Sequence, residues 1–149
     1  MSGNLTAVSS PPLALLLLQA SRWFDSQLLE RLEQRGWPRL TPAQSLVFAH
    51  LPAGGAPPAT LARSLGTSRQ AAHELVAGLE QLDLLRLGED PDRRRGRLVV
   101  LTARGEGLAR DARTVLAELE DGLGGQRVDS LHDLLVALLG SGTTGEQMR

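Results

Sequence analysis

The sequence contains no cysteine and no tyrosine, and two Trp and two Phe are its only aromatic residues, 3% of 149. Without cysteine, the chain cannot have a disulfide framework, a cysteine-based zinc site or a thiol switch. With so few aromatic side chains, the core must be built from Leu and Ala with some Val, a composition that favours helices. We therefore expect a mainly α-helical protein.

Lysine is also absent, so all 16 basic residues are Arg; with 17 acidic residues, the net charge is −1. Arginine makes bidentate contacts to phosphate and guanine, but in a chain rich in Ala, Leu and Gly its exclusive use is equally typical of a GC-rich genome. The positive charge is concentrated. From Arg86 to Arg104 there are six Arg and three acidic residues, a local charge of 6 − 3 = +3. This segment is a candidate contact for a polyanion.

Long apolar runs are missing too. The run from Leu13 to Leu18 is far shorter than the roughly 20 residues of a membrane helix, and its flanks do not fit a signal peptide. We expect a cytoplasmic protein. The sequence has no G-x-S-x-G motif and no phosphate-binding glycine loop, so it predicts no enzyme. Asp129, His132 and Asp133 have helical spacing, but helix capping and surface charge explain them better than a metal site, so we expect no metal and no cofactor.

Apolar periodicity and capping residues predict a series of helices. The first runs from Leu13 to Arg35, and the next begins at a capping box formed by Thr41 and Gln44. A short helix from Pro58 to Leu65 ends at Gly66. After the basic segment, Thr102 caps a helix that extends to about Leu119 or Leu123. Asp129 or Ser130 caps the last helix, and the tail after residue 140 is expected to be disordered, as are residues 1–12.

The segment from Thr67 to Thr102 combines a helix with a hairpin. Thr67 and Gln70 form a T-x-x-Q capping pattern that predicts the helix start. Its apolar positions face the core and leave polar residues on the outer side at the amino end, as a helix that enters the DNA major groove requires. Two β-prone runs follow, residues 84–87 and 97–101, separated by the turn-forming sequence G-E-D-P-D-R-R-R-G. They predict a hairpin with an arginine-rich tip.

A series of short motifs runs through residues 37–110: L-T-x-x-Q at 40–44, L-A at 61–62, L-G-T-S-R at 65–69, L-E at 79–80, L-L-R at 84–86, D-P at 90–91, R-R at 94–95 and L-T-x-x-G at 101–105. In their order and spacing, the chain resembles the winged helix-turn-helix of the MarR family of bacterial transcriptional regulators. Two positions depart from the family pattern. Arg93 stands where the family usually has an Asp that braces the wing, and Asp83 replaces the glycine that ends the recognition helix.

The resemblance implies an α+β fold, mainly α with a small β-hairpin wing, flanked by terminal dimerisation helices. We expect an N-terminal dimerisation helix over 13–36, a DNA-binding domain over 37–104, C-terminal dimerisation helices over 105–140 and a disordered tail over 141–149. The two recognition helices of a homodimer would then reach successive major grooves, about 34 Å apart. The resulting function is a sequence-specific repressor that a small molecule releases from a palindromic operator. The alternative is a winged-helix interaction module or antirepressor that binds no operator. The net charge of −1 and the altered wing Asp favour this alternative.

The expected contacts to double-stranded DNA come from two groups of residues, Ser68, Arg69, Gln70 and His73 on the helix and Arg93, Arg94, Arg95 and Arg97 on the wing. Each of these contacts has an alternative. Gln70 can instead cap the helix, and His73 can be a plain exposed histidine. The wing arginines can belong to a solvated turn that Asp90 and Asp92 brace. In the family, aromatic or phenolic effectors bind between the dimer helices and the winged domain. We therefore also consider an effector pocket formed by Trp23, Phe24, Trp37 and Phe48. The alternative is that these aromatic residues simply pack in the core.

Overall fold

The computed structural model describes residues 10–94 and 96–144, the side chains of the last three excepted. Within this part, the chain forms six helices and one hairpin, in the order α1 (Leu13–Gln34), α2 (Pro42–His50), α3 (Pro58–Leu65), α4 (Arg69–Gln81), β1 (Leu85–Glu89), β2 (Arg97–Leu101), α5 (Ala103–Gly122) and α6 (Gly125–Thr144). The expected fold, mainly α with a small β-hairpin, is confirmed. None of these helices has the length and apolarity needed to cross a bilayer.

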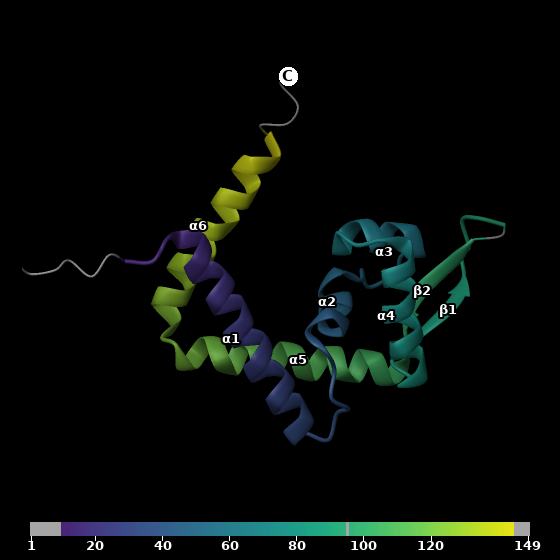
Figure 1. Ribbon diagram of the computed structural model, residues 1–149. Coiled ribbons are helices and arrows are strands. Elements are labelled where there is room, and N and C mark those ends of the chain that lie inside the picture. The colour runs from purple at the N-terminus through teal and green to yellow at the C-terminus, as the bar shows by residue number, and fades with distance from the viewer. Residues whose placement is uncertain (1–9, 95, 145–149) are drawn as a thin grey trace, which may run out of the picture.

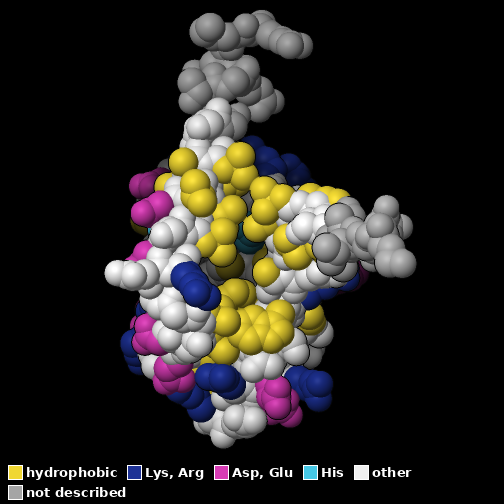
Figure 2. Space-filling view, turned by 90° about the vertical axis from the view of Figure 1, so that its left-hand side faces the viewer, with side chains coloured by type: hydrophobic (Ala, Val, Ile, Leu, Met, Phe, Trp, Pro, Cys, Tyr) yellow, Lys and Arg dark blue, Asp and Glu magenta, His cyan; other side chains and the backbone are white. Residues whose placement is uncertain are grey.

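Two regions are connected by one long helix (Figure 1). Helices α2, α3 and α4 and the hairpin form one region, which we call the winged unit (residues 37–104). Helix α5 runs from this unit towards α1 and α6, which form the other region. Hydrophobic side chains gather on the surface of α1 and α6 that faces away from the winged unit (Figure 2). Exposed large hydrophobic residues are therefore concentrated in the second region, and Leu46 of α2 is the one in the winged unit among the described residues.

The sheet consists of two antiparallel strands, in a register that pairs Leu85 with Leu101 and Glu89 with Arg97. A single residue pair extends it on the other side: Ala56 N donates to Val99 O at 3.1 Å and Val99 N donates to Ala56 O at 2.8 Å. Strand β2 thus lies between Ala56 and β1. Since β1 has no further strand beside it within the described residues, it forms the free edge of the wing.

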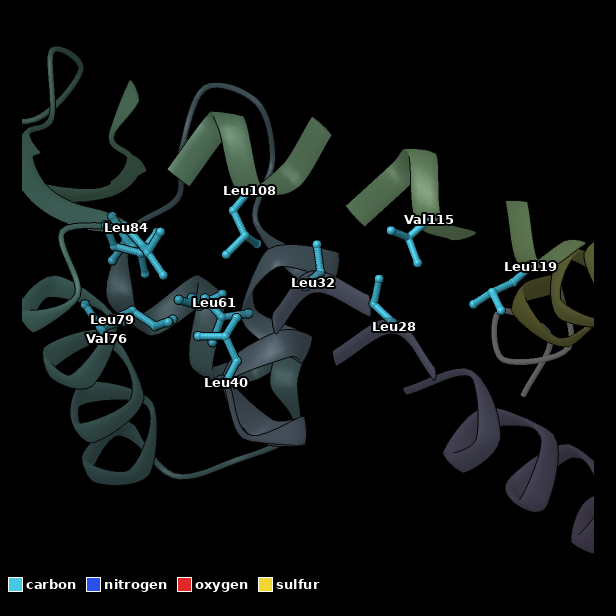
Figure 3. Close-up of a cluster of buried hydrophobic side chains, with 13 residues drawn as sticks. Leu28, Leu32, Leu40, Leu61, Val76, Leu79, Leu84, Leu108, Val115 and Leu119 are labelled. Atoms are coloured by element: carbon cyan, nitrogen blue, oxygen red, sulfur yellow. The ribbon is translucent and has the colours of Figure 1, made fainter. Parts of the chain in front are cut away.

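A continuous hydrophobic core connects the two regions (Figure 3). In the winged unit, Leu61, Leu79 and Leu84 are fully buried, and Leu108 of α5 joins them. The core continues between α1 and α5 through Leu28, Leu32, Val115 and Leu119. At the surface of this contact, Arg35 Nη2 donates to both carboxylate oxygens of Glu118, at 3.0 and 3.2 Å. Helix α5 is thereby fixed to both regions.

Several predicted helix ends are confirmed. The capping box before α2 is complete, since Gln44 N donates to Thr41 Oγ1 at 3.1 Å and Thr41 N donates to Gln44 Oε1 at 3.0 Å. Helix α3 spans the predicted residues and ends at Gly66, whose φ of 65° is left-handed. The side chain of Thr102 caps α5.

The prediction for the last helix was wrong at both ends. Gly124 has a φ of 93° and ends the preceding turn, and α6 begins directly after it, so neither Asp129 nor Ser130 is a cap. Instead, Ser130 Oγ donates to Gln126 O, one turn back inside the helix, at 2.9 Å. The helix continues to Thr144, beyond the expected boundary at residue 140. Residues 1–9 and 145–149, for which we predicted disorder, lie outside the described residues.

Candidate nucleic-acid interface

The start of α4 differs from the prediction by one residue. The cap is Ser68, whose Oγ accepts from Ala71 N at 3.1 Å, and not Thr67. Thr67 N donates to Ala62 O at 3.1 Å and completes the end of α3 after the left-handed Gly66, so this N–H does not bond to the Gln70 side chain as a capping box requires. The expected capping box of Thr67 and Gln70 is therefore wrong. Gln70 Nε2 instead donates to Glu74 Oε1 at 3.2 Å along the helix.

Helix α4 has one buried and one exposed side. Ala72, Val76 and Leu79 are buried against the core. Arg69, Gln70, His73 and Glu74 are exposed, as predicted. Because side chains three or four residues apart lie on the same side of a helix, the first two turns present a guanidinium, an amide and an imidazole together. These groups are suited to hydrogen bonding with base edges or phosphates.

The turn of the wing is organised by Asp90. Asp90 N donates to Gly96 O at 2.9 Å and closes the end of the hairpin, while Asp90 Oδ1 accepts from Asp92 N at 2.9 Å. An Asp that accepts from the amide two residues on forms an Asx turn. Gly96 is required here, because a Cβ at this position would lie 2.8 Å from Arg93 Cβ and 3.0 Å from Asp90 Cβ. Among the described residues, no ion pair braces the wing.

The wing and α4 enclose a hollow of about 470 Å³, which we call the saddle. It is lined by Arg69, Gln70 and His73 from α4, by the start of α3, and by Asp90, Arg93, Gly96 and Arg97 from the wing. The structure thus brings five of the predicted DNA-binding residues together, although at least 20 positions separate the two groups in the sequence. With three arginines and one Asp, the saddle carries an excess of positive charge.

The other predicted residues lie around the saddle. Ser68 is at the start of α4, where its hydroxyl oxygen serves as the cap. Arg94 lines a second hollow, of about 900 Å³, on the wing. Arg95 lies outside the described residues. Arg86 also lines the second hollow and was missed as a site residue; its position at the start of the basic segment was the only signal in the sequence.

A junction below the saddle fixes the wing relative to α4. Helix α4 is followed by Asp83, which has a φ of 57°, the left-handed conformation expected where the family has glycine. Thr102 Oγ1 donates to Asp83 O at 2.6 Å and accepts from Gly105 N at 3.0 Å, and Thr102 N donates to Leu84 O at 3.1 Å. Gly105 is packed so closely that a Cβ would overlap Leu84 O. The end of the recognition helix, the end of the wing and the start of α5 therefore meet at one point.

The four aromatic residues come from three segments. Trp23 and Phe24 of α1 pack edge to face with ring centroids 5.0 Å apart. Trp37, between α1 and α2, donates from Nε1 to Asp111 Oδ2 at 2.7 Å and lies under the Arg104 guanidinium at 5.7 Å. Phe48 packs on the core from α2. Phe24 and Trp37 also contact the core, so core packing accounts for three of the four. An effector pocket formed by these residues stays a prediction.

No cluster of three or more His, Asp or Glu side chains that would suit a metal ion is present in the described part of the chain. His132 and Asp133 lie 3.9 Å apart, Nδ1 to Oδ1, but both side chains are exposed on α6.

Comparisons with known proteins agree with this arrangement. Residues 40–96 match the sequence model of the MarR family. The transcriptional regulator PA3341 is 26% identical with a TM-score of 0.68, over 90% of this chain and 99% of that chain. The transcriptional regulator PA4135 is also 26% identical, with a TM-score of 0.66, over 88% of this chain and 98% of that chain. The apo form of MarR from E. coli shares the fold, with 24% identity and a TM-score of 0.67, over 87% of this chain and 98% of that chain. No relative was found among the curated proteins.

Proposed function

We propose that the chain is a DNA-binding transcriptional regulator of the MarR family and that it acts as a homodimeric repressor. The match of residues 40–96 to the family model and the fold shared with the transcriptional regulator PA3341 support this proposal. It binds a palindromic operator and leaves it when a small molecule binds. The observation that carries this proposal is the saddle, in which polar groups of the recognition helix and arginines of the wing lie on the same side of the winged unit. That arrangement allows one element to enter the major groove while the other contacts the adjacent backbone or minor groove.

The proposed contacts follow from position and chemistry. Arg69 is exposed at the start of α4 and reads a base edge, with guanine its best partner. Gln70 and His73 extend this contact along the helix. Ser68 and the wing arginines Arg93, Arg94, Arg95 and Arg97 hold the phosphate backbone or the minor groove. The winged unit over 37–104 thus binds DNA.

The dimer is proposed to form through α1 and residues 105–140, because their apolar residues lack cover within one chain. The exposed large hydrophobic residues of this surface, visible in part in Figure 2, include Leu13, Leu16, Trp23, Leu123, Leu131, Leu134, Val136 and Leu138. Helix α6 has no buried side chain among its described residues. A helix of 20 residues gains most of its stability from packing, so a second copy supplies the contacts that are missing.

DNA binding is tested by fluorescence anisotropy with the duplex upstream of the protein's own gene and with an unrelated duplex. We expect tight binding to the first, which weakens steeply with salt as phosphate contacts release counterions. Arg69→Ala should reduce the preference between the two duplexes, whereas Arg94→Ala should weaken both alike. Arg113→Ala, an exposed residue in the middle of α5, is the control. If the wild type binds neither duplex at low salt, the protein is instead an interaction module or antirepressor without an operator.

The dimer is tested by sedimentation of Leu134→Glu. A charge on the proposed interface should produce a monomer that binds the operator much more weakly and loses part of its helical content, because α6 then lacks the packing that a second copy provides. A monomeric wild type would contradict the proposal.

Release by an effector is tested by adding a panel of phenolic and aromatic carboxylic acids to the operator complex. An effector that prefers the unbound form lowers the operator affinity by the ratio of its affinities for the two forms. We expect at least one compound to shift the binding curve of the wild type, and Trp23→Ala to reduce that shift. If no compound of the panel changes the DNA affinity, the protein does not respond to this class of effector.

A further inference from the structure

The wing has a second basic surface, which includes no residue of the recognition helix. It is the hollow of about 900 Å³ lined by Arg86 to Pro91 of β1 and the turn, and by Arg93, Arg94, Gly96 and Arg97. Four arginines face two acidic residues, Glu89 and Asp90. We call this hollow the outer face of the wing. None of its lining residues comes from α3 or α4, in contrast to the saddle.

Arg86 reaches the outer face because of the strand geometry. Successive residues of a strand point to opposite sides, and Leu85 is buried in the core, so Arg86 points away from it. Gly88 is the next residue on the same side. A Cβ at Gly88 would lie 3.0 Å from Arg86 Nη1, so the guanidinium extends along β1 over the glycine, towards the tip of the wing. A larger residue at 88 would displace it.

The guanidinium of Arg86 has no partner within the described residues. Its side chain is exposed, and it forms no ion pair with Glu89 or with any other described acid. Arg94 lines the same hollow, so an anion bound there meets positive charge from two side chains. A phosphate oxygen pair fits the fork of a guanidinium.

The saddle and the outer face share residues of the turn, but only the saddle is lined by α4 and only the outer face is lined by Arg86. Arg97 pairs with Glu89, three positions from Arg86 on β1, so Arg86 and Arg97 point to opposite faces of the hairpin. The minor groove of B-DNA is bounded by two phosphate backbones, so a wing tip that enters it has one backbone on each side. We propose that Arg86, together with Arg94, binds a phosphate of the second backbone on the outer face, while the saddle holds the first. This inference rests on the proposed operator binding and adds a residue and a DNA strand to it.

The decisive variant is Arg86→Gln, tested at several salt concentrations on the operator and on an unrelated duplex. Each lost phosphate contact should lower the slope of log affinity against log salt by about 0.9 per subunit. Affinity for both duplexes should fall by the same factor, because a phosphate contact carries no sequence information. Arg86→Lys should retain most of the slope. Arg113→Gln on α5, far from the wing, is the matched control and should behave as the wild type.

A methylphosphonate scan of the operator locates the contact. Neutralising the phosphate that Arg86 touches should weaken the wild type but leave Arg86→Gln unaffected, and this phosphate should lie on the strand that Arg69 and Arg97 do not touch. Gly88→Val, which moves the guanidinium but keeps its charge, should give part of the same loss. An unchanged thermal unfolding midpoint shows that the variants are folded. The inference is overturned if the wild type binds with a steep salt slope and Arg86→Gln has the same slope, or if it changes sequence preference. If the wild type itself binds no duplex, the proposed function fails first.

Discussion

Leucine side chains are buried in the core of the winged unit but largely exposed on the terminal helices. Leu79 of α4 is 0% exposed, in a core to which six other elements contribute, whereas Leu134 of α6 is 70% exposed. The difference shows that the winged unit has all the contacts it needs within one chain, while the apolar surface of α1 and α6 is left for a partner.

Equivalent truncations in the two regions give the sharpest test of this difference. Leu79→Ala should lower the free energy of unfolding by about 2–5 kcal/mol, because it leaves a cavity in a core that cannot collapse. This loss should be the same at every protein concentration. The cost of Leu134→Ala should instead depend on concentration and fall within about 0.5 kcal/mol for the monomer. Chemical denaturation over a range of concentrations measures both, and equal, concentration-independent losses would contradict the comparison.

The junction between the regions should tolerate almost no added volume. Gly105→Ala places a methyl group against the Leu84 carbonyl and should destabilise by about 1–3 kcal/mol. Gly122→Ala, in the same helix but with open space around it, should have the opposite sign and stabilise by up to about 1 kcal/mol. Thermal unfolding of the pair gives the comparison. A neutral Gly105→Ala would mean that α5 is less tightly held at Leu84 than the structure indicates.

A smaller effect is expected where the winged unit stores strain. Asp83 has a φ of 57°, which costs an L-residue free energy that glycine avoids. Asp83→Gly should raise the free energy of unfolding by about 1 kcal/mol or less, and Asp83→Ala should lower it. Urea titrations resolve the two signs. If both variants are less stable than the wild type, the Asp83 side chain contributes more than its backbone costs.

The smallest effect should come from the ion pair between α1 and α5. Glu118→Gln removes the partner of Arg35, but both side chains are more than a third exposed, so solvent screening leaves about 0.5 kcal/mol or less. The loss should disappear in 1 M salt, where the Debye length is about 3 Å. Glu120→Gln, exposed on the same helix, is the control. A salt-independent loss would show that Glu118 acts through packing rather than charge.

Local sequence signals predicted the elements that depend on local chemistry. The capping box of Thr41, the helix from Pro58 to Gly66 and the cap of Thr102 depend on residues within a few positions of each other, and all three are confirmed. Thr67 shows the limit of such signals. It carries the better capping pattern, but the preceding helix uses its amide, and the cap passes to Ser68.

Local sequence signals could not predict the contacts between residues that are far apart in the chain. Trp37 and Asp111 are 74 positions apart and Arg35 and Glu118 are 83 apart, and nothing local marks either pair. The pairing of Ala56 with Val99 depends on a loop folding back on the sheet. The position of the Arg86 guanidinium could not be predicted either, because it depends on the missing side chain at Gly88, which lies next to it only once the strand is formed.

The meeting point at Thr102 has a mechanical consequence. One hydroxyl group is bonded both to the residue that ends the recognition helix and to the first turn of α5, and the neighbouring glycine leaves no gap. We therefore expect that a tilt of α5 moves the end of α4 and the end of β2 together with it. The other end of α5 lies among the terminal helices, so a change in their packing is expected to reach the winged unit through this helix.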